Sequence, residues 1–193
     1  MGRRRAFDED DIVEAAMQLF WKKGFERATL DELMEQTNIS KSSLYNTFSS
    51  KGALLEKVLA RYGETWMAGL LEPLSRPEAG RAEIEESFAT LAARFSGPLA
   101  KQGCLMTNCA IDVAPHDAVA QKLTAALRGS FERILLAAVE RGQAQGTISR
   151  SEPALSLARA LTNALNGMSV LAKLNPRRAA LEDIARLSLR ILD

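Results

Sequence analysis

Residues 29–48 combine hydroxyl, amide, phenol and ammonium groups at spacings that could bind a phosphate backbone and base edges. Thr29 and Glu32 form a capping box, which predicts that a helix begins directly after the threonine. Asn38 suits the left-handed residue of a tight turn, and Ser40 is a good N-cap for a second short helix. Two short helices joined by such a turn form a helix-turn-helix, which is our interpretation of this segment.

The second short helix is predicted to have one buried and one exposed face. Leu44 and Phe48 are four residues apart, so they lie on the same side of the helix and face the core. The side chains that remain outside are Lys41, Ser42, Ser43, Tyr45, Asn46 and Thr47. This outer face fits a major groove, where such groups meet phosphates and base edges. The alternative is an ordinary solvated helix surface, because these residue types are common on the outside of helices.

This stretch resembles the DNA-binding module of the TetR (tetracycline-repressor-like) family of bacterial transcriptional regulators. The resemblance covers about residues 6–66, and beyond them it extends only to the architecture. It rests on the order and spacing of Phe20-Trp21-Lys22-Lys23-Gly24-Phe25, Ala28-Thr29-Leu30, Ile39-Ser40-Lys41-Ser42-Ser43-Leu44-Tyr45, Phe48, Ser50-Lys51 and Leu54-Leu55.

The resemblance implies two groups of DNA contacts. The residues that would face bases are Ser42, Ser43 and Asn46. Those that would hold phosphates are Thr29, Lys41, Tyr45 and Lys51, the last together with the backbone amides that open the next helix. The basic arm Arg3–Arg5 either enters an adjacent minor groove or is a disordered tail.

The charge balance limits non-specific affinity for DNA. The 193 residues carry 25 Lys or Arg and 24 Asp or Glu, which gives a net charge of +1. Even residues 1–51 hold eight basic and nine acidic residues. A near-neutral module implies modest non-specific affinity, with specificity that depends on a symmetric dimer.

The hydrophobic pattern predicts helices throughout the chain and therefore an all-α fold. After the short pair, the predicted helices span about 51–71, 81–95, 102–113, 117–144, 153–173 and 177–192. Pro73 and Pro77 are expected to close the first of these. We expect a helix-turn-helix domain over residues 1–52 and a helical effector-binding and dimerisation domain over residues 53–193. The helix at their boundary is shared, so it could carry a shift from one domain to the other.

Two features bear on the location of the protein. No run approaches the roughly 20 apolar residues of a membrane span. The basic residues after Met1 are followed by acidic residues rather than by an apolar segment, so no secretory signal is expected. With only two cysteines in addition, we expect a cytoplasmic protein.

The segments 153–173 and 177–192 offer more apolar surface than one small core needs. The first mixes small residues with larger apolar ones, namely Ala158, Leu161, Ala164, Leu165, Gly167, Met168 and Leu171. Such a surface allows two copies to approach closely, so we expect a homodimer with a four-helix interface. The alternative is that these residues are internal core.

The helices at about 81–95, 102–113 and 117–144, with the end of the helix before them, could enclose a cavity for a small-molecule effector. The candidate ligand-binding residues are Trp66, Phe88, Phe95, Cys104, Asn108, Phe131 and Met168. Each of these could instead be a core or surface residue.

Cys104 and Cys109 lie five residues apart on one predicted helix. At that separation they differ by about 140° and about 7.5 Å of rise, so they cannot form a disulfide unless the helix melts. Cys104 is the better placed to react, with Lys101 or Lys173 as conceivable partners. The resemblance implies one use for it, because some family members sense electrophiles or oxidants through such a thiol. The alternative is a small buried hydrophobic residue.

The sequence contains little that indicates catalysis. It has one histidine, without a nucleophile-base arrangement, a glycine-rich phosphate loop or paired metal ligands near it. We therefore expect no enzyme activity, no cofactor and no metal.

The resulting hypothesis is a dimeric DNA-binding transcriptional regulator, a repressor that a small molecule releases from a palindromic operator. One alternative is a redox- or electrophile-sensing repressor that acts through Cys104. The other is a helical enzyme or binding module that uses the N-terminal domain only as a scaffold.

Overall fold

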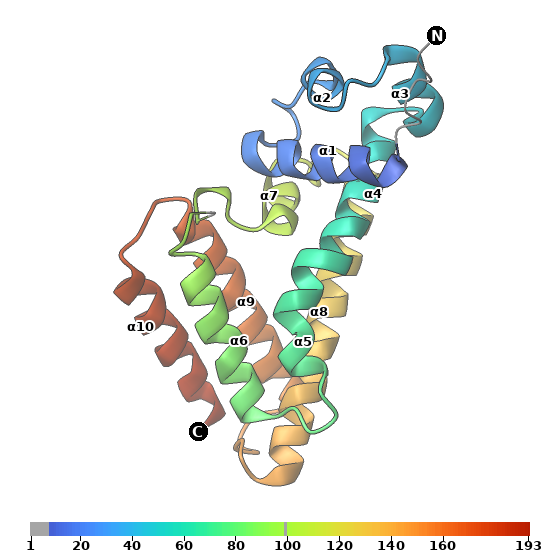
Figure 1. Cartoon of the computed structure of the whole chain (residues 1–193). Coiled ribbons are helices and arrows are strands. Elements are labelled where there is room, and N and C mark those ends of the chain that lie inside the picture. Colours follow the sequence, from blue (N-terminus) through green and yellow to red (C-terminus); the bar gives the residue numbers. More distant parts are fainter. Residues whose placement is uncertain (1–7, 99) are drawn as a thin grey trace.

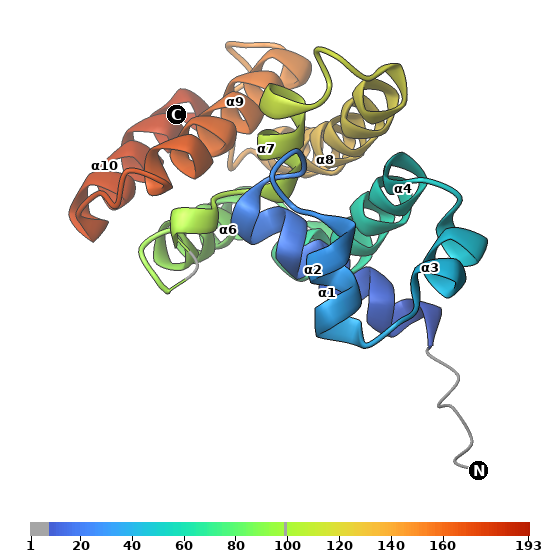
Figure 2. The same ribbon diagram turned by 90° about the horizontal axis from the view of Figure 1, so that it is seen from above.

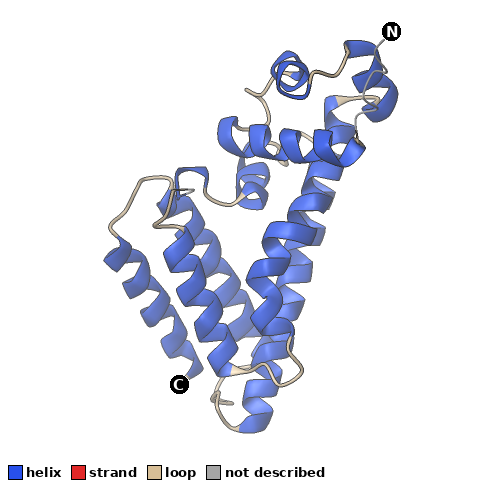
Figure 3. Ribbon diagram, viewed as in Figure 1, coloured by secondary structure: helices blue, strands red, loops and turns tan. Residues whose placement is uncertain are grey.

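In a computed structural model that describes residues 8–98 and 100–193, every regular element is helical (Figure 3). The predicted all-α class is therefore confirmed. The α-helices are α1 (Glu9–Lys23), α2 (Leu30–Thr37), α3 (Lys41–Phe48), α4 (Lys51–Tyr62), α5 (Ala68–Ser75), α6 (Arg81–Arg94), α7 (Leu105–Asp112), α8 (Ala118–Gln145), α9 (Ala154–Ala172) and α10 (Arg178–Leu189). A π-helical segment, Gly63–Met67, joins α4 to α5, and short 3-10 segments lie at Ala100–Gln102 and Arg190–Leu192. None of the described helices has the length and apolar character that crossing a membrane requires.

Local sequence signals set the ends of the first three helices. The Thr29 hydroxyl accepts from the Glu32 backbone N–H, and the Glu32 carboxylate accepts from the Thr29 N–H, both at 3.2 Å. Asn38 has a left-handed backbone with φ of 53°, and Ser40 caps α3 by accepting from the Ser43 N–H. The predicted capping box, turn residue and N-cap are all confirmed.

The helices form two groups that α4 connects (Figures 1 and 2). Helices α1, α2 and α3 gather at one end of the molecule, and α4 leads from them into the bundle of the remaining helices. The long helix α8 packs along both α4 and α5, and α9 packs against α8, α6 and α10. The interior of the bundle is apolar and closed to solvent at Leu59, Ile84, Phe88, Leu135 and Leu161.

The helix predicted over residues 51–71 differs from the structure in two ways. It contains the π-helical segment, and it continues through Pro73 to Ser75. Pro73 removes only one backbone donor, and it lies in the last turn, so the helix tolerates it. In the π-helical segment the Ala68 N–H donates to the Gly63 carbonyl, five residues back instead of four. The prediction that Pro73 closes this helix is therefore wrong, whereas the helix does end before Pro77, the second proline predicted to close it.

The continuity of this helix matters for the predicted domain boundary. The predicted division between residues 52 and 53 falls inside the first turn of α4, which begins at Lys51. From Lys51 to Ser75 the chain runs through α4, the π-helical segment and α5 without a loop. The exact division into domains stays a prediction, but a helix shared by the two parts is present.

The helix predicted over residues 102–113 is shorter than expected. Gly103 has a left-handed backbone with φ of 63°, and a Cβ atom there would lie 2.8 Å from the Ser169 carbonyl oxygen. Because the chain turns at this glycine, α7 begins only at Leu105. Cys104 is therefore the N-cap residue of α7 rather than part of the helix, whereas Cys109 lies within it. Both thiols are free and buried.

Candidate nucleic-acid interface and internal cavity

Helix α3 has the two faces that the sequence predicts. Leu44 and Phe48 are buried against the core, with 2% and 3% of their surface exposed. The exposed side chains are Lys41, Ser42, Ser43, Tyr45, Asn46 and Thr47. Contact of this face with DNA stays a prediction. The arm Arg3–Arg5, predicted for a minor groove, lies outside the described residues.

The hydroxyl groups at the start of α3 form a cluster. The Ser40 hydroxyl oxygen lies 3.1 Å from that of Ser42 and 2.9 Å from that of Ser43. A hydroxyl can donate and accept at once, so these serines keep hydrogen-bonding capacity for an external partner. Among the described residues, the side chains of Tyr45 and Asn46 have no hydrogen-bond partner, and both are exposed. The polar face of α3 can therefore bind a partner without first breaking internal contacts.

Thr29 stands at the exposed start of α2. Its hydroxyl oxygen is occupied by the Glu32 N–H, which leaves the hydroxyl hydrogen to donate outward. Lys23 forms an ion pair with Glu32, and this contact, with the bond from the Thr29 N–H, lowers the pKa of Glu32. A charged carboxylate at the start of α2 also favours the positive end of the helix dipole.

Lys51 is bound within the protein. Its ammonium group donates to the carbonyl oxygens of Phe25 and, at 3.4 Å, of Glu26, and it lies 4.4 Å from the centroid of the Phe25 ring. Partial burial lowers the pKa of Lys51. Two of the three ammonium hydrogens hold the loop before α2, so one remains for the predicted phosphate contact. The structure thus gives Lys51 a structural role that the sequence pattern does not reveal.

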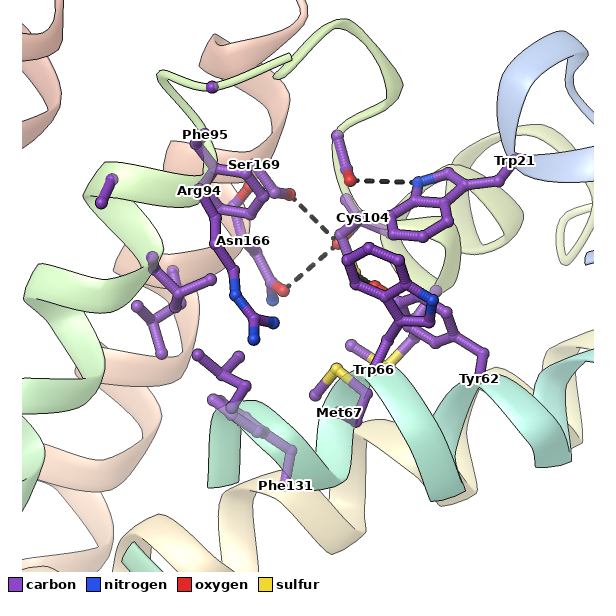
Figure 4. A pocket seen from close by; sticks show the side chains of 18 of the residues that line it. Trp21, Tyr62, Trp66, Met67, Arg94, Phe95, Cys104, Phe131, Asn166 and Ser169 are labelled. Atoms are coloured by element: carbon purple, nitrogen blue, oxygen red, sulfur yellow. Dashed lines mark hydrogen bonds between the residues drawn. The ribbon is translucent and has the colours of Figure 1, made fainter. Parts of the chain in front are cut away.

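A cavity of about 410 Å³ lies where α1, α4, the π-helical segment, α5, α6, α7, α8 and α9 meet (Figure 4). Its aromatic lining is Trp21, Tyr62, Trp66, Phe95 and Phe131, and its polar lining includes Arg94, Cys104, Thr107, Asn166 and Ser169. Figure 4 shows Tyr62, Trp66 and Met67 on one side of the space and Arg94, Phe95, Asn166 and Ser169 on the other. A mostly apolar space with a few polar groups is typical of a small-molecule site.

Four of the seven predicted ligand-binding residues line this cavity: Trp66, Phe95, Cys104 and Phe131. Phe88 and Met168 do not, because both are fully buried in the core. Asn108 is also absent from the lining. Its amide nitrogen donates to the Gln102 carbonyl, and its amide oxygen accepts from the Lys173 ammonium at 2.8 Å. Ligand binding itself stays a prediction for the four that line the space.

Sequence reasoning missed Trp21, Tyr62 and Arg94 as lining residues. Tyr62 precedes Trp66 by four residues on the same predicted helix, so helical spacing could have found it. Trp21 belongs to α1, in the part predicted to bind DNA, and no local pattern connects it with a cavity in the other part. Arg94 is an exposed residue in the last turn of its helix, where a charged side chain is unremarkable.

Trp21, Tyr62 and Cys104 are linked through one polar and aromatic contact network. The Trp21 indole N–H donates to the Gly103 carbonyl at 3.1 Å, and its ring meets Tyr62 and Trp66 edge to face at centroid distances of 5.2 and 4.6 Å. The Tyr62 hydroxyl donates to the Cys104 sulfur at 3.3 Å. Burial raises the pKa of Tyr62 well above its usual range, so this hydroxyl stays protonated. The first helix of the chain therefore forms part of the cavity wall beside a thiol.

The two cysteines have different surroundings. Cys104 borders the cavity and is hydrogen-bonded to Tyr62 rather than to Lys173, which is bound to Asn108. Burial raises the pKa of Cys109 to about 12, so that this thiol is protonated near neutral pH. Among the described residues, no group of three or more His, Cys, Asp or Glu side chains is placed to hold a metal ion.

Two family models match the chain. Residues 12–58 match the model of bacterial regulatory proteins of the tetR family, and residues 75–187 match the tetracyclin repressor-like C-terminal domain. The matched regions include the capping box, the turn and α3 in the first case, and most of the helical bundle in the second.

Full-length relatives carry the names of regulators. The chain is 27% identical to an uncharacterized HTH-type transcriptional regulator of Bacillus subtilis, YezE, over all of both chains. It is 29% identical to the HTH-type transcriptional repressor ComR of Escherichia coli, over 98% of this chain and 91% of the relative. The structure is similar to a cysteine mutant of the TetR family transcriptional regulator CifR complexed with 26-base-pair operator DNA. That similarity has a TM-score of 0.87 and 31% identity over 99% of this chain and 100% of the other. All three carry the names of transcriptional regulators, so the hypothesis of a helical enzyme has no support from them.

The structural role of Lys51 can be tested by its effect on stability. We expect Lys51→Met to lower the free energy of unfolding by about 1–2 kcal/mol, because the Phe25 and Glu26 carbonyls lose a charged donor. The matched variant Lys41→Met, at an exposed position, should change it by less than about 0.5 kcal/mol. Urea unfolding at one protein concentration measures both. Equal stability of the two variants would contradict a structural role for Lys51.

Proposed function

Since this chain belongs to the tetR family of DNA-binding transcriptional regulators, we propose that it is a dimeric repressor which a small molecule releases from a palindromic operator. The observation that carries the proposal is the position of Trp21. This residue lies on the first helix of the DNA-binding part, and it also forms part of the wall of the cavity. A regulator of this kind acts on the chromosome, which agrees with the expected cytoplasmic location.

In the DNA complex, α3 lies in the major groove. Ser42, Ser43 and Asn46 face bases, and Thr29, Lys41, Tyr45 and Lys51 hold phosphates. The exposure of the α3 face and the free side chains of Tyr45 and Asn46 support this arrangement. The relative CifR is complexed with operator DNA through a chain of similar fold, which supports the same mode of use here.

The test is binding to the DNA upstream of the protein's own gene at two salt concentrations, with competitor DNA present. We expect specific binding that weakens with salt. Lys41→Gln removes one ammonium group per protomer, and therefore two per dimer, from the phosphate backbone, so it should reduce the slope of log affinity against log salt by about 1.8. Tyr45→Ala should weaken binding to all sequences, because the phenol binds a phosphate rather than a base. A protein that binds this DNA no better than competitor DNA would argue against the proposal.

We propose α9 and α10 as the dimer interface. Five large apolar side chains are exposed along this part of the chain: Leu155, Val170, Leu174, Leu187 and Ile191. Gly167 is exposed on α9, and a Cβ atom there would meet nothing within 4 Å, so a second helix could approach closely. Of the interface residues expected from the sequence, Ala158, Leu161 and Met168 are fully buried within the protomer. These three are core residues, and the interface uses the opposite face of α9.

Leu187→Glu tests this interface, since 52% of Leu187 is exposed and its replacement leaves the core intact. We expect the variant to be monomeric at micromolar concentration and to bind the operator far more weakly, because a charge would be buried twice in a symmetric interface. Val119→Glu on α8, where 50% of the residue is exposed, is the matched control and should remain a dimer. Light scattering measures the mass of each. A dimeric Leu187→Glu protein would place the interface elsewhere.

The effector would act through the walls that it touches. A molecule in the cavity contacts Trp21 of α1 and Trp66 of the π-helical segment at once, so it can shift α1 and α4 together. Because α4 begins directly after α3, such a shift changes the spacing of the two recognition helices in the dimer. The effector needs a difference in affinity between the two states on the order of 1–3 kcal/mol.

A second candidate function is sensing of electrophiles or oxidants through Cys104. The specific observation in its favour is that this sulfur borders the cavity and is bound to Tyr62, next to Trp21. Modification of the thiol would place new atoms in the space that a reversible effector would fill. The two candidates therefore share the site and differ in whether a covalent bond is formed.

The thiols should differ in reactivity. At pH 8, a small alkylating reagent should modify Cys104 through the cavity and leave Cys109 unmodified, since a pKa of about 12 leaves on the order of 0.01% thiolate. Peptide mass spectrometry of the native protein measures both. If Cys104→Ser keeps operator release by a mild electrophile, while Cys109→Ser behaves like the parent, the thiol-sensing candidate fails and the reversible effector remains.

A further inference from the structure

The charge of the cavity wall has one sign. Among the described residues of the lining, Arg94 is the only one with a charged side chain, and none of the others is Asp, Glu, Lys or His. The described residues give its guanidinium no ion-pair partner, although most of the other arginines described have one or donate to carbonyl oxygens. Its guanidinium carbon instead lies 5.8 Å from the centroid of the Trp66 ring. Figure 4 shows the side chain reaching from α6 toward the wall that carries Trp66.

The free hydrogen-bonding groups in the lining are mainly donors. Three acceptors are already used: the Gly103 carbonyl by Trp21, the Cys104 sulfur by Tyr62, and the Asn166 amide oxygen by Thr107. The Asn166 amide nitrogen and the Arg94 guanidinium have no acceptor among the described residues. A ligand with acceptor atoms therefore complements these two groups.

The rest of the lining is apolar and sets the size of the ligand body. Trp21, Trp66, Leu70, Leu91 and Phe131 present ring and methyl surfaces to the space. A cavity of about 410 Å³ falls within the roughly 300–1,000 Å³ typical of small-molecule sites. It has room for a six-membered ring or a short alkyl chain.

We propose that the effector is a small apolar carboxylate. Its anionic group binds Arg94 and the Asn166 amide, and its hydrocarbon body fills the space between Trp21, Trp66 and Phe131. The assignment rests on the proposed function, in which this cavity holds the effector. A cationic ligand would face Arg94 without a carboxylate to balance it. A neutral ligand would leave the positive charge of the guanidinium without a counter-charge.

Arg94 also has a simpler role, because a cation in the last turn of α6 stabilises the helix dipole. If this were its only role, replacement of Arg94 would affect stability. The relative affinities of the protein for ligands of different charge would then stay unchanged. Because the residue is exposed, Arg94→Gln leaves the core unchanged and the variant can be studied as a folded protein.

The experiment uses the two tryptophans of the chain, Trp21 and Trp66, which both line the cavity, so intrinsic fluorescence reports on this space. The probes are 3-cyclohexylpropionate, its neutral amide and 3-cyclohexylpropylamine, which share a hydrocarbon body and differ in charge. At pH 7 we expect the carboxylate to bind the parent protein at least tenfold more tightly than the amide, and the amine to bind most weakly. In Arg94→Gln the carboxylate should lose that advantage, whereas Arg133→Gln, at an exposed position on α8 outside the lining, should keep it.

Other outcomes would overturn the assignment. They are equal binding of acid and amide, preference for the amine, an unchanged preference in Arg94→Gln, and no fluorescence change with millimolar acid. Operator release by the same probes is measured in parallel. If the carboxylate binds in an Arg94-dependent way without releasing the operator, the ligand class stands and the proposed coupling to DNA fails.

Discussion

The buried indole of Trp21 is the contact on which the relation between the DNA-binding helices and the cavity depends. Only 5% of this residue is exposed, its N–H is satisfied by the Gly103 carbonyl, and its ring lies edge to face with Tyr62 and Trp66. A buried donor left without its acceptor would cost about 1–3 kcal/mol. The position of α1 is therefore coupled to the turn before α7, and that turn requires the left-handed backbone that glycine adopts at little cost.

The uninterrupted run from α4 through the π-helical segment to α5 gives this coupling a second route. Its first residue, Lys51, holds the loop before α2 through two carbonyl oxygens. Further along, Tyr62, Trp66 and Met67 line the cavity. A π-helical turn often marks a functional position, and here the segment Gly63–Met67 contains two of these lining residues, Trp66 and Met67. No loop lies between Lys51 and the residues of this run that line the cavity. A displacement of the cavity wall can therefore pass along the helix to Lys51 and the loop that it holds.

The ion pairs on the surface of this protein contribute little to its stability. The ion pairs between α1 and α4, Lys57 with Glu9 and Arg61 with Asp10, are at the surface and each adds little to the free energy of folding. Lys41 on α3 and Arg94 at the cavity are two of several described basic residues, Lys122 and Arg177 among them, that form no ion pair. What sets these two apart is their place, because each lies where an anionic partner is proposed, a phosphate in one case and a carboxylate in the other.

The sequence by itself determined the local features whose causes lie within a few residues. The capping box at Thr29, the left-handed Asn38, the Ser40 cap and the two faces of α3 all follow from side chains that act on neighbouring backbone groups. The same reasoning found Trp66, Phe95, Cys104 and Phe131 as bulky or soft residues near a possible cavity. It placed Phe88 and Met168 there as well, because spacing along a helix does not distinguish a residue in the core from one beside an empty space. Tertiary structure decided what depends on distant contacts. It brought Trp21 to Gly103, 82 residues away in sequence, directed Lys51 to the loop before α2, and turned Arg94 toward Trp66. These arrangements depend on how whole helices pack, and no local pattern of residues specifies that.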